Sequence, residues 1–311
     1  MKTKVKVAVN GVGTIGKRVA YAVKLQKDME LKALIGYSPN PILRNQLEPN
    51  GPLYGTELWA TDKEALKRLQ EGGMFVHGTL EELLRNGAVD IIVDATPAGV
   101  GRWYRDNVYS KFGVKAIFQG GEKSDVGEMS FNAIVNYEEA LGKQFVRVPS
   151  CNTTGLIRTL HAIDSKIGIE YAFVALARRA ADPWEYRKGP INAVEFTKVP
   201  SHHAPDVKTV LKHLNIFSMA IKIPTTLAHT HIVEVTTKKE TSKEEVIEAF
   251  EKQTRVILLD IEDYPSTSLI IEKFRDYLRP RYDMYEIVVL RDSINVEGRK
   301  VRWFHVVHQE A

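Results

Sequence analysis

A glycine-rich hexapeptide near the N-terminus constrains the fold of this chain more than any other feature. It reads Gly-Val-Gly-Thr-Ile-Gly over residues 11–16, and it lies between an alternating apolar run at residues 5–9 and a helix-like run. A strand, a tight glycine turn and a helix in this order are typical of a dinucleotide-binding unit. Gly11 permits the turn, Gly13 lets the backbone approach a pyrophosphate, and Gly16 allows close packing of helix on strand.

The helix that follows this turn supplies further donors. The amides of Thr14 and Ile15 are expected to point at the phosphates from its N-terminus. The alternative for the whole hexapeptide is an incidental turn. Its position directly after a strand and before a helix favours dinucleotide binding.

The end of the second strand bears on the choice of cofactor. A strand is expected at residues 31–35, where such folds often carry an acid that bonds the adenosine ribose. Gly36-Tyr37-Ser38-Pro39 stands there instead. Because no carboxylate repels a 2′-phosphate, the sequence leaves NADP and NAD both open.

The rest of the N-terminal half predicts a parallel sheet. Continuous apolar character indicates buried strands at residues 89–94 and 116–118, followed by the turns 95–99 and 119–122. Turns at the carboxyl ends of strands are where open α/β sheets bind ligands. The prolines and glycines of residues 39–61 favour a loop there.

The C-terminal half predicts a different architecture. Strand-like runs recur at residues 172–177, 219–223, 232–235, 257–261 and 287–290. A helix at 242–250 is indicated by the capping box of Ser242 and Glu245. The fold class is therefore α/β, with an N-terminal Rossmann-type parallel-sheet domain and an α+β catalytic domain that has a mixed or antiparallel sheet. The expected domains are residues 1–150 for the dinucleotide and 151–305 for the substrate, with 306–311 returning toward the nucleotide domain.

Length and composition limit the classes of function. A chain of 311 residues is expected to hold two domains, and no apolar run approaches the length that a membrane span needs. One cysteine allows no internal disulfide, and the N-terminus lacks a secretory signal, so a cytoplasmic location is expected. The net charge of +4, with lysines interspersed among acids, argues against a nucleic-acid surface and leaves room for an anionic small substrate.

That one cysteine, Cys151, stands where a strand-like run gives way to a helix-like run. The sequence there is Ser-Cys-Asn-Thr-Thr-Gly over residues 150–155. Backbone N–H groups and the positive end of a helix dipole are expected to favour its thiolate. A small hydrophobe in the core is the alternative, and the polar neighbours favour the reactive reading.

Histidines of the C-terminal half are the candidate partners of this thiol. His202 and His203 lie in a predicted loop, and His229 and His231 share one face of a predicted strand. A metal site and purely structural histidines are both alternatives, although no second thiolate or carboxylate partner supports a metal. The third interpretation is a general base beside the thiol together with donors for an anionic substrate.

Taken together, these segments resemble the archaeal type of phosphorylating glyceraldehyde-3-phosphate dehydrogenase. The resemblance covers almost the whole chain in the family's order, through residues 10–19, 119–123, 150–155, 178–183, 199–203, 224–227 and 307–310. It implies a glycolytic oxidoreductase that converts glyceraldehyde 3-phosphate, inorganic phosphate and NAD or NADP to 1,3-bisphosphoglycerate. It also implies a homotetramer. Composition and residue pattern, as above, predict no nucleic-acid or membrane partner and no metal.

The resemblance further implies roles for individual residues. Cys151 would be the nucleophile that forms a thiohemiacetal and then a thioester, and His229, or alternatively His231, would be the base. The implied contacts, all by number in this sequence, are Ser150, Cys151, Asn152, His202 and His203 for the substrate and Thr14, Ile15, Gly121, Arg179 and Gln309 for the cofactor.

Two departures from the family pattern and two rival functions accompany this prediction. Tyr37 and Ser38 stand where the family often has lysine and threonine. The family's further C-terminal helix has no counterpart before Ala311, so either another element or subunit is expected to cover that surface, or the chain tolerates a looser cofactor domain. A thiol-dependent semialdehyde dehydrogenase, such as one for aspartate semialdehyde, is the first rival. A nonenzymatic NAD(P)-responsive binding protein is the second.

Overall fold

The computed structural model describes residues 4–119, 121–182, 185 and 188–311. Contacts divide the chain into two compact units. The first, here the N-terminal unit, comprises the residues up to Phe131 together with Glu138–Pro149. The second, the C-terminal unit, comprises Asn132–Tyr137 and Ser150–Ala311. No helix within the described residues is long and apolar enough to cross a membrane.

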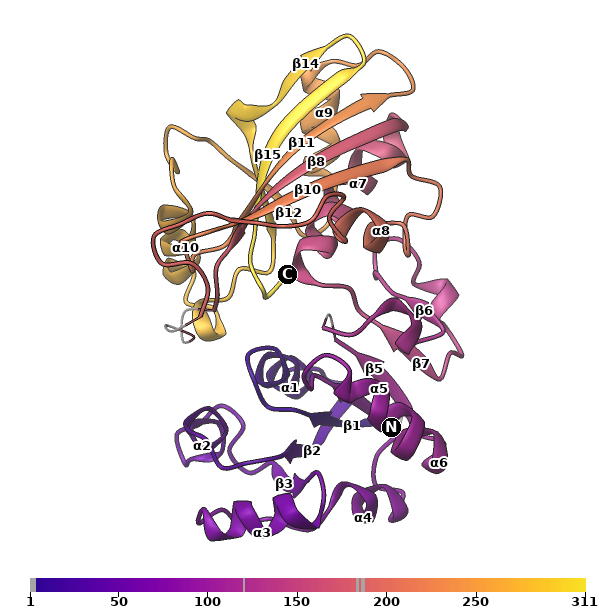
Figure 1. Ribbon diagram of the computed structural model, residues 1–311, viewed down its shortest axis with the longest axis vertical. Coiled ribbons are helices and arrows are strands. Elements are labelled where there is room, and N and C mark those ends of the chain that lie inside the picture. The colour runs from indigo at the N-terminus through magenta and orange to yellow at the C-terminus, as the bar shows by residue number, and fades with distance from the viewer. Residues whose placement is uncertain (1–3, 120, 183–184, 186–187) are drawn as a thin grey trace. The chain divides into compact units, whose positions relative to one another are not determined.

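A parallel sheet forms the centre of the N-terminal unit (Figure 1). In the described part of the chain it has seven strands in the order β3-β2-β1-β4-β5-β7-β6. The strands are β1 (Val5–Asn10), β2 (Met29–Gly36), β3 (Glu57–Ala60), β4 (Ile91–Asp94), β5 (Lys115–Phe118), β6 (Met129–Ser130) and β7 (Phe145–Arg147). Strand order reverses between β1 and β4, which is the switch point where such sheets bind ligands.

Helices connect the strands of this sheet. They are α1 (Gly16–Lys24), α2 (Pro41–Leu47), α3 (Lys63–Glu71), α4 (Leu80–Arg85), α5 (Val100–Tyr104) and α6 (Ser110–Phe112). The predicted strands and the helix after the glycine turn are confirmed. The prediction of a loop over residues 39–61 is wrong, because α2 and β3 lie within it. The Asn40 side chain caps α2 and Pro41 fills its first position, where a proline has its φ set for a helix and loses no needed N–H.

A mixed sheet forms the C-terminal unit. Its path through the described residues is β12-β13-β15-β11-β8-β10-β9, and β14 pairs with β15. The strands are β8 (Ile169–Arg179), β9 (Glu195–Phe196), β10 (Ile216–Ile223), β11 (His229–Thr237), β12 (Val256–Leu259), β13 (Ile287–Leu290), β14 (Asn295–Glu297) and β15 (Lys300–Val307). Parallel and antiparallel pairs both occur, so the predicted fold class is confirmed for both sheets.

The α-helices in the described part of this second unit are α7 (Cys151–Lys166), α8 (His203–Val207), α9 (Lys243–Glu251) and α10 (Thr267–Asp276). The helix α7 buries Leu156, Ile157, Leu160 and Ile163 in one core with the sheet and α9. The capping box of Ser242 and Glu245 is present at the start of α9, as predicted. This packing fixes the N-terminus of α7, and with it Cys151, against the sheet.

Candidate active site

The glycine turn of the N-terminal unit has the shape that the sequence predicts. Gly11 has a φ of +89°, and a Cβ there would lie 2.9 Å from the Ala95 backbone after β4. A Cβ on Gly16 would lie 1.8 Å from the Gly11 carbonyl oxygen, so only glycine fits where α1 meets the turn. A Cβ on Gly13 would meet nothing within 4 Å. The backbone is therefore open at Gly13, where a ligand must come close.

Thr14 and Ile15 lie between this opening and the first turn of α1. Ile15 is the N-cap of the helix, and the Thr14 carbonyl accepts a hydrogen bond from Arg18 Nη1 at 2.7 Å. Gly121 lies across from the turn after β4, since a Cβ on it would be 3.6 Å from the Ala98 nitrogen. The neighbouring Gly120 of the predicted turn lies outside the described residues.

A buried polar cluster supports the base of the glycine turn. Asn10 Nδ2 donates to the Tyr109 hydroxyl at 2.8 Å, and that hydroxyl donates to Asp94 Oδ2 at 2.6 Å. Thr96 donates to the other carboxylate oxygen of Asp94 through its hydroxyl, at 2.5 Å, and through its backbone N–H. Burial raises the pKa of Asp94, while these donors oppose that shift. The sequence analysis missed Tyr109, which lies in a short π-helical turn between α5 and α6.

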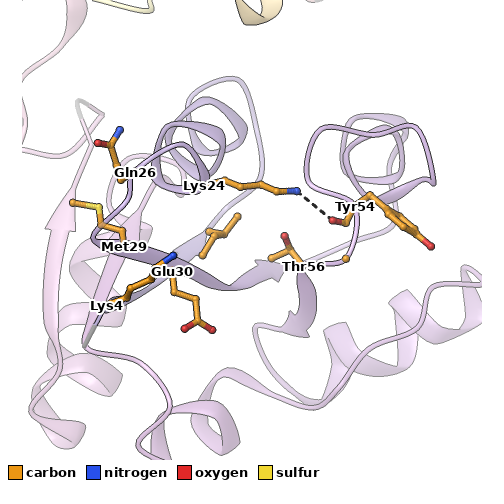
Figure 2. Close-up of a pocket in the computed structure, with 9 residues that line it drawn as sticks. Lys4, Lys24, Gln26, Met29, Glu30, Tyr54 and Thr56 are labelled. Carbon is orange, nitrogen blue, oxygen red and sulfur yellow. Dashed lines mark hydrogen bonds between the residues drawn. The ribbon is translucent and has the colours of Figure 1, made fainter. Parts of the chain in front are cut away.

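One hollow of this unit holds none of the predicted site residues. It has a volume of about 260 Å³ and is lined by Lys4, Met29 and Thr56 among others. Figure 2 shows Lys24 reaching across it to the backbone oxygen of Tyr54, at 3.3 Å. The hollow lies at the amino end of β2, whereas the glycine turn follows the carboxyl end of β1.

In the C-terminal unit, Cys151 is the first residue of α7. The N-cap is Ser150, whose hydroxyl accepts a hydrogen bond from the Thr153 N–H at 3.4 Å. Thr153 in turn donates from its hydroxyl to Asp206 Oδ2 at 2.7 Å. The half-buried Cys151 Sγ lies 3.7 Å from His229 Nε2 and 4.0 Å from Asn152 Nδ2. The structure thus brings the predicted thiol, imidazole and amide together.

The ionisation of Cys151 differs from the sequence-based expectation. Burial raises the pKa of the thiol, against the opposing influence of Arg179, the Asn152 backbone N–H and Arg178. Glu310 adds to the raising effect. The helix terminus favours the thiolate, but the surrounding protein removes the water that a thiolate needs. The predicted resting thiolate is therefore wrong for this structure, and the thiol is the favoured form.

Arg179 controls the proton of His229. The Arg179 backbone N–H donates to His229 Nδ1 at 3.0 Å, and its Nε lies 3.3 Å from His229 Nε2. Burial and the charges of Arg179 and Arg178 hold the pKa of His229 well below its ordinary value, so the ring is neutral. A neutral ring can accept at one nitrogen only. Arg179 presents a donor to each ring nitrogen, so the neutral ring has two tautomers: with its proton on Nε2 it accepts from the Arg179 N–H at Nδ1, and with its proton on Nδ1 it accepts from Arg179 Nε at Nε2.

His231 has a different environment from His229. Both lie on the buried face of β11, but His231 is fully enclosed. Its Nε2 lies 2.8 Å from Asn152 Oδ1, and its Nδ1 lies 2.8 Å from His305 Nε2. Both ring nitrogens therefore have partners other than the sulfur.

The second histidine pair lies at the start of α8. The rings of His202 and His203 are 4.0 Å apart, and His203 Nδ1 lies 3.1 Å from the Ser201 hydroxyl. His203 is buried, and burial lowers its pKa to about 3, with the nearby His202 and Arg178 adding to the shift. Within the described residues, His203 Nε2 and Arg178 Nε are buried atoms with no hydrogen-bond partner. The predicted helix-free loop is wrong here, because His203 begins a short helix.

The C-terminal residues contribute polar groups as well. Gln309 Nε2 donates to Glu310 Oε1 at 3.0 Å, and His308 Nδ1 bonds to the other oxygen of Glu310. Gln309 Oε1 and His308 Nε2 are buried with no hydrogen-bond partner among the described residues. Val307 pairs with His229 in the ladder between β15 and β11, so His308 directly follows the residue opposite His229.

A metal site was one of the alternatives left open by the sequence. A search of residues 4–119, 121–182, 185 and 188–311 finds no group of three or more histidine, cysteine, aspartate or glutamate side chains that could hold a metal ion. Pro183, which ends one of the segments used for the resemblance, lies outside those residues.

His305 and Trp303 were not among the predicted site residues, although the alternation of polar and apolar residues in β15 could have placed both on the buried face.

Comparison with known proteins agrees with this geometry. Residues 150–293 match the model of the glyceraldehyde 3-phosphate dehydrogenase C-terminal domain. The chain is 49% identical over 310 residues to glyceraldehyde-3-phosphate dehydrogenase of Pyrococcus abyssi, covering 99% of this chain and 90% of that protein. It is 47% identical over 311 residues to the enzyme of that name from Hyperthermus butylicus, covering 99% and 88%.

A third relative extends the range of organisms. The glyceraldehyde-3-phosphate dehydrogenase of Methanopyrus kandleri is 45% identical over 314 residues, covering 99% of this chain and 88% of its own length. Identity of this extent includes both units, and the thiol of the family is present as Cys151. The chain belongs to the glyceraldehyde-3-phosphate dehydrogenase family, in its archaeal type.

Proposed function

We propose that this chain oxidises glyceraldehyde 3-phosphate with NADP or NAD and inorganic phosphate, forming 1,3-bisphosphoglycerate in the cytoplasm as a homotetramer. The observation that carries the proposal is Cys151 Sγ at 3.7 Å from His229 Nε2, at the first position of a capped helix. Residues 1–150 would hold the dinucleotide and 151–305 the substrate, with 306–311 serving the nucleotide side. The family membership of the chain supports each of these assignments.

Formation of the first covalent intermediate needs a thiolate. The thiol gives up its proton, the sulfur adds to the aldehyde carbon as the π bond of the carbonyl breaks, and the carbonyl oxygen takes up one proton, so the product is a thiohemiacetal with no net change in protons. His229 Nε2 and Asn152 Nδ2 lie 3.7 and 4.0 Å from the sulfur, where each can donate a hydrogen bond to the thiolate. Arg179 and Arg178 lower the pKa of Cys151 and so oppose the cost of burial.

The proposed cofactor would lie on the glycine turn. The open backbone at Gly13 and the buried Asn10 Oδ1, which has no partner among the described residues, fit a polar ligand there. A bound nicotinamide supplies the hydride acceptor for the thiohemiacetal. Thr14, Ile15, Gly16 and Gly121 would contact the dinucleotide from the N-terminal unit, and Arg179 and Gln309 from the C-terminal unit.

A base must take the hydroxyl proton as the hydride leaves. The structure supports His229 over His231 in this role, because both nitrogens of His231 are occupied by Asn152 and His305. The role needs Nε2 without a proton, so His229 must hold its proton on Nδ1 at that stage. The lowered pKa of His229 keeps the ring neutral and able to accept.

Phosphate groups would be bound by the second histidine pair together with Arg178. His203 Nε2 and Arg178 Nε have no hydrogen-bond partner among the described residues, and both influence His229 electrostatically. Because His203 is neutral, it can donate one hydrogen bond to a phosphate oxygen, while Arg178 supplies positive charge. His202, stacked on His203, would be the second donor.

Steady-state kinetics with two aldehydes tests the proposal. Glyceraldehyde 3-phosphate, with inorganic phosphate and either cofactor, is expected to turn over faster than aspartate semialdehyde under the same conditions. Omission of phosphate should stop multiple turnover and leave a single burst of reduced cofactor, because the thioester then waits for its acceptor. Faster turnover of aspartate semialdehyde would overturn the substrate assignment, and undiminished turnover without phosphate would overturn the acyl acceptor.

A further inference from the structure

Four buried side chains link the core of the C-terminal unit to the thiol. They are Trp303 and His305 on β15, His231 on β11 and Asn152 on α7, here called the Trp303–Asn152 network. Each is at most 4% exposed. The distances along the network are 3.1 Å from Trp303 Nε1 to His305 Nδ1, 2.8 Å from His305 Nε2 to His231 Nδ1, and 2.8 Å from His231 Nε2 to Asn152 Oδ1.

The chemistry of these groups fixes the direction of every hydrogen bond. Trp303 can only donate, so His305 Nδ1 accepts. Burial lowers the pKa of His305 to about 3 and that of His231 well below its ordinary value, so both rings are neutral and carry one proton each. His305 therefore donates from Nε2 to His231 Nδ1, and His231 donates from Nε2 to Asn152 Oδ1.

This direction decides which way the Asn152 amide faces. Its oxygen must accept from His231, so its NH2 group points to Cys151 Sγ at 4.0 Å. The reversed amide would set an NH2 group against the N–H of His231 and an oxygen against the sulfur. We propose that Trp303, His305 and His231 are positioning residues that hold the Asn152 amide with its NH2 group toward the sulfur, where it stabilises the negative charge that the thiolate carries before it attacks.

The fold supplies the geometry that this network requires. Antiparallel pairing of β11 with β15 puts His231 opposite His305, and period-two alternation puts Trp303 on the same face. Gly155 lets α7 approach that face closely, since a Cβ there would lie 3.2 Å from Val307 Cγ2. The close approach brings Asn152 within hydrogen-bond distance of a strand that is 79 residues away in sequence.

The network deepens the proposed function, on which it rests, but its test needs neither aldehyde nor cofactor. Cys151 is the only cysteine in the sequence, so alkylation by iodoacetamide reports on that sulfur alone. The rate against pH gives the apparent pKa of the thiol, because the thiolate is the nucleophile. The other groups that influence the sulfur, Arg178, Arg179 and Glu310, are unchanged in every variant.

A matched pair of substitutions separates positioning from packing. The amide nitrogen of His231→Gln can occupy the place of Nε2 and still donate to Asn152, whereas His231→Asn is too short to do so. We expect His231→Asn to slow alkylation at pH 7 about tenfold, through a raised apparent pKa of Cys151, because a donor to the charged form is lost. His231→Gln should remain within about twofold of the unaltered protein.

The double variant completes the test. If His231 acts through Asn152, then His231→Asn should slow alkylation no further in an Asn152→Ala background. The proposal would be overturned if His231→Asn and His231→Gln slowed alkylation equally. It would also be overturned if His231→Asn slowed alkylation further in the Asn152→Ala background. Should His231→Asn fail to fold by circular dichroism, His305→Asn and His305→Gln provide the same contrast one step away. Failure of the aldehyde assay with an intact alkylation pattern would reject the proposed function and leave the network standing.

Discussion

The candidate site of the N-terminal unit is formed mainly by the backbone of one hexapeptide. The candidate site of the C-terminal unit consists of side chains from α7, β8 and β11, which β15 supports. The glycine turn depends on the path of its backbone and on the lack of a Cβ at Gly11 and Gly16. The thiol site depends on the ionisation and hydrogen-bond direction of individual groups, such as His229 and Asn152. The two units should therefore respond to different kinds of substitution: added volume in the first, and lost chemistry at nearly constant volume in the second.

The largest effect is expected from removing the thiol of Cys151 with little change in side-chain volume. Cys151→Ala should lower turnover at least about 10,000-fold, since no neighbouring group replaces the nucleophile. Binding of NADP or NAD, measured by calorimetry, should stay within about threefold of the unaltered protein. Retained turnover would contradict a covalent mechanism, and loss of cofactor binding would show that the two sites are not separable in this way.

The next largest effect is expected from adding one methyl group to the glycine turn. Gly16→Ala forces a Cβ to 1.8 Å from the Gly11 carbonyl, so we expect a loss of about 3 kcal/mol in the free energy of unfolding and no measurable cofactor binding. Gly13→Ala is the matched control, because its Cβ meets nothing within 4 Å. It should weaken cofactor binding and leave the unfolding free energy nearly unchanged. Equal destabilisation by both substitutions would show that the packing argument for Gly16 is wrong.

These contrasts explain which features the sequence could predict. The glycine turn could be predicted because its geometry depends on six contiguous residues. The shared face of His229 and His231 could be predicted because side chains alternate along a strand such as β11. The prediction of a loop at residues 39–61 was wrong. It gave the prolines and glycines of this segment more weight than the helix start signal of Asn40 and Pro41.

The remaining features depend on tertiary contacts that no local pattern encodes. Tyr109 reaches Asp94 across 15 residues, and His305 reaches His231 across 74. The raised pKa of Cys151 has the same origin: the helix terminus is visible in the sequence, but the burial that opposes it is a property of the packed unit. Roles assigned to Ser150, His202, His203 and Gln309 stay predictions until the variants are measured.

The pH dependence of the thiol tests the balance between burial and positive charge. Because burial raises the pKa of Cys151, the thiolate fraction should still be rising at pH 8.5, the ordinary value for a cysteine. Alkylation by iodoacetamide should therefore accelerate about 30-fold between pH 7 and pH 8.5, without a plateau. His229 stays neutral over this interval because its pKa is lowered, so it adds no second step. A plateau below pH 7 would mean that the arginines and the helix terminus outweigh burial.

The smallest effect concerns cofactor choice, and it comes from the end of β2. Tyr37 follows that strand, and the guanidinium carbon of Arg68 lies 4.3 Å from the centre of its ring. The buried Nε of Arg68 has no hydrogen-bond partner among the described residues. A cation held in this way, where no acid follows the strand, suits a 2′-phosphate. We therefore expect Arg68→Gln to raise the KM for NADP about tenfold and to leave the KM for NAD within about twofold.

Lys67→Gln is the control for Arg68→Gln, since it removes the same charge from the neighbouring position of α3. Lys67 is exposed and pairs with Glu71 along the helix, at 3.7 Å, so its contribution is screened by solvent. Both KM values should then be unchanged by Lys67→Gln. If the two substitutions raise the KM for NADP equally, the effect is one of net charge, and the stacked guanidinium has no specific role. If Arg68→Gln raises both KM values together, Arg68 supports the shape of the turn and does not discriminate between the cofactors.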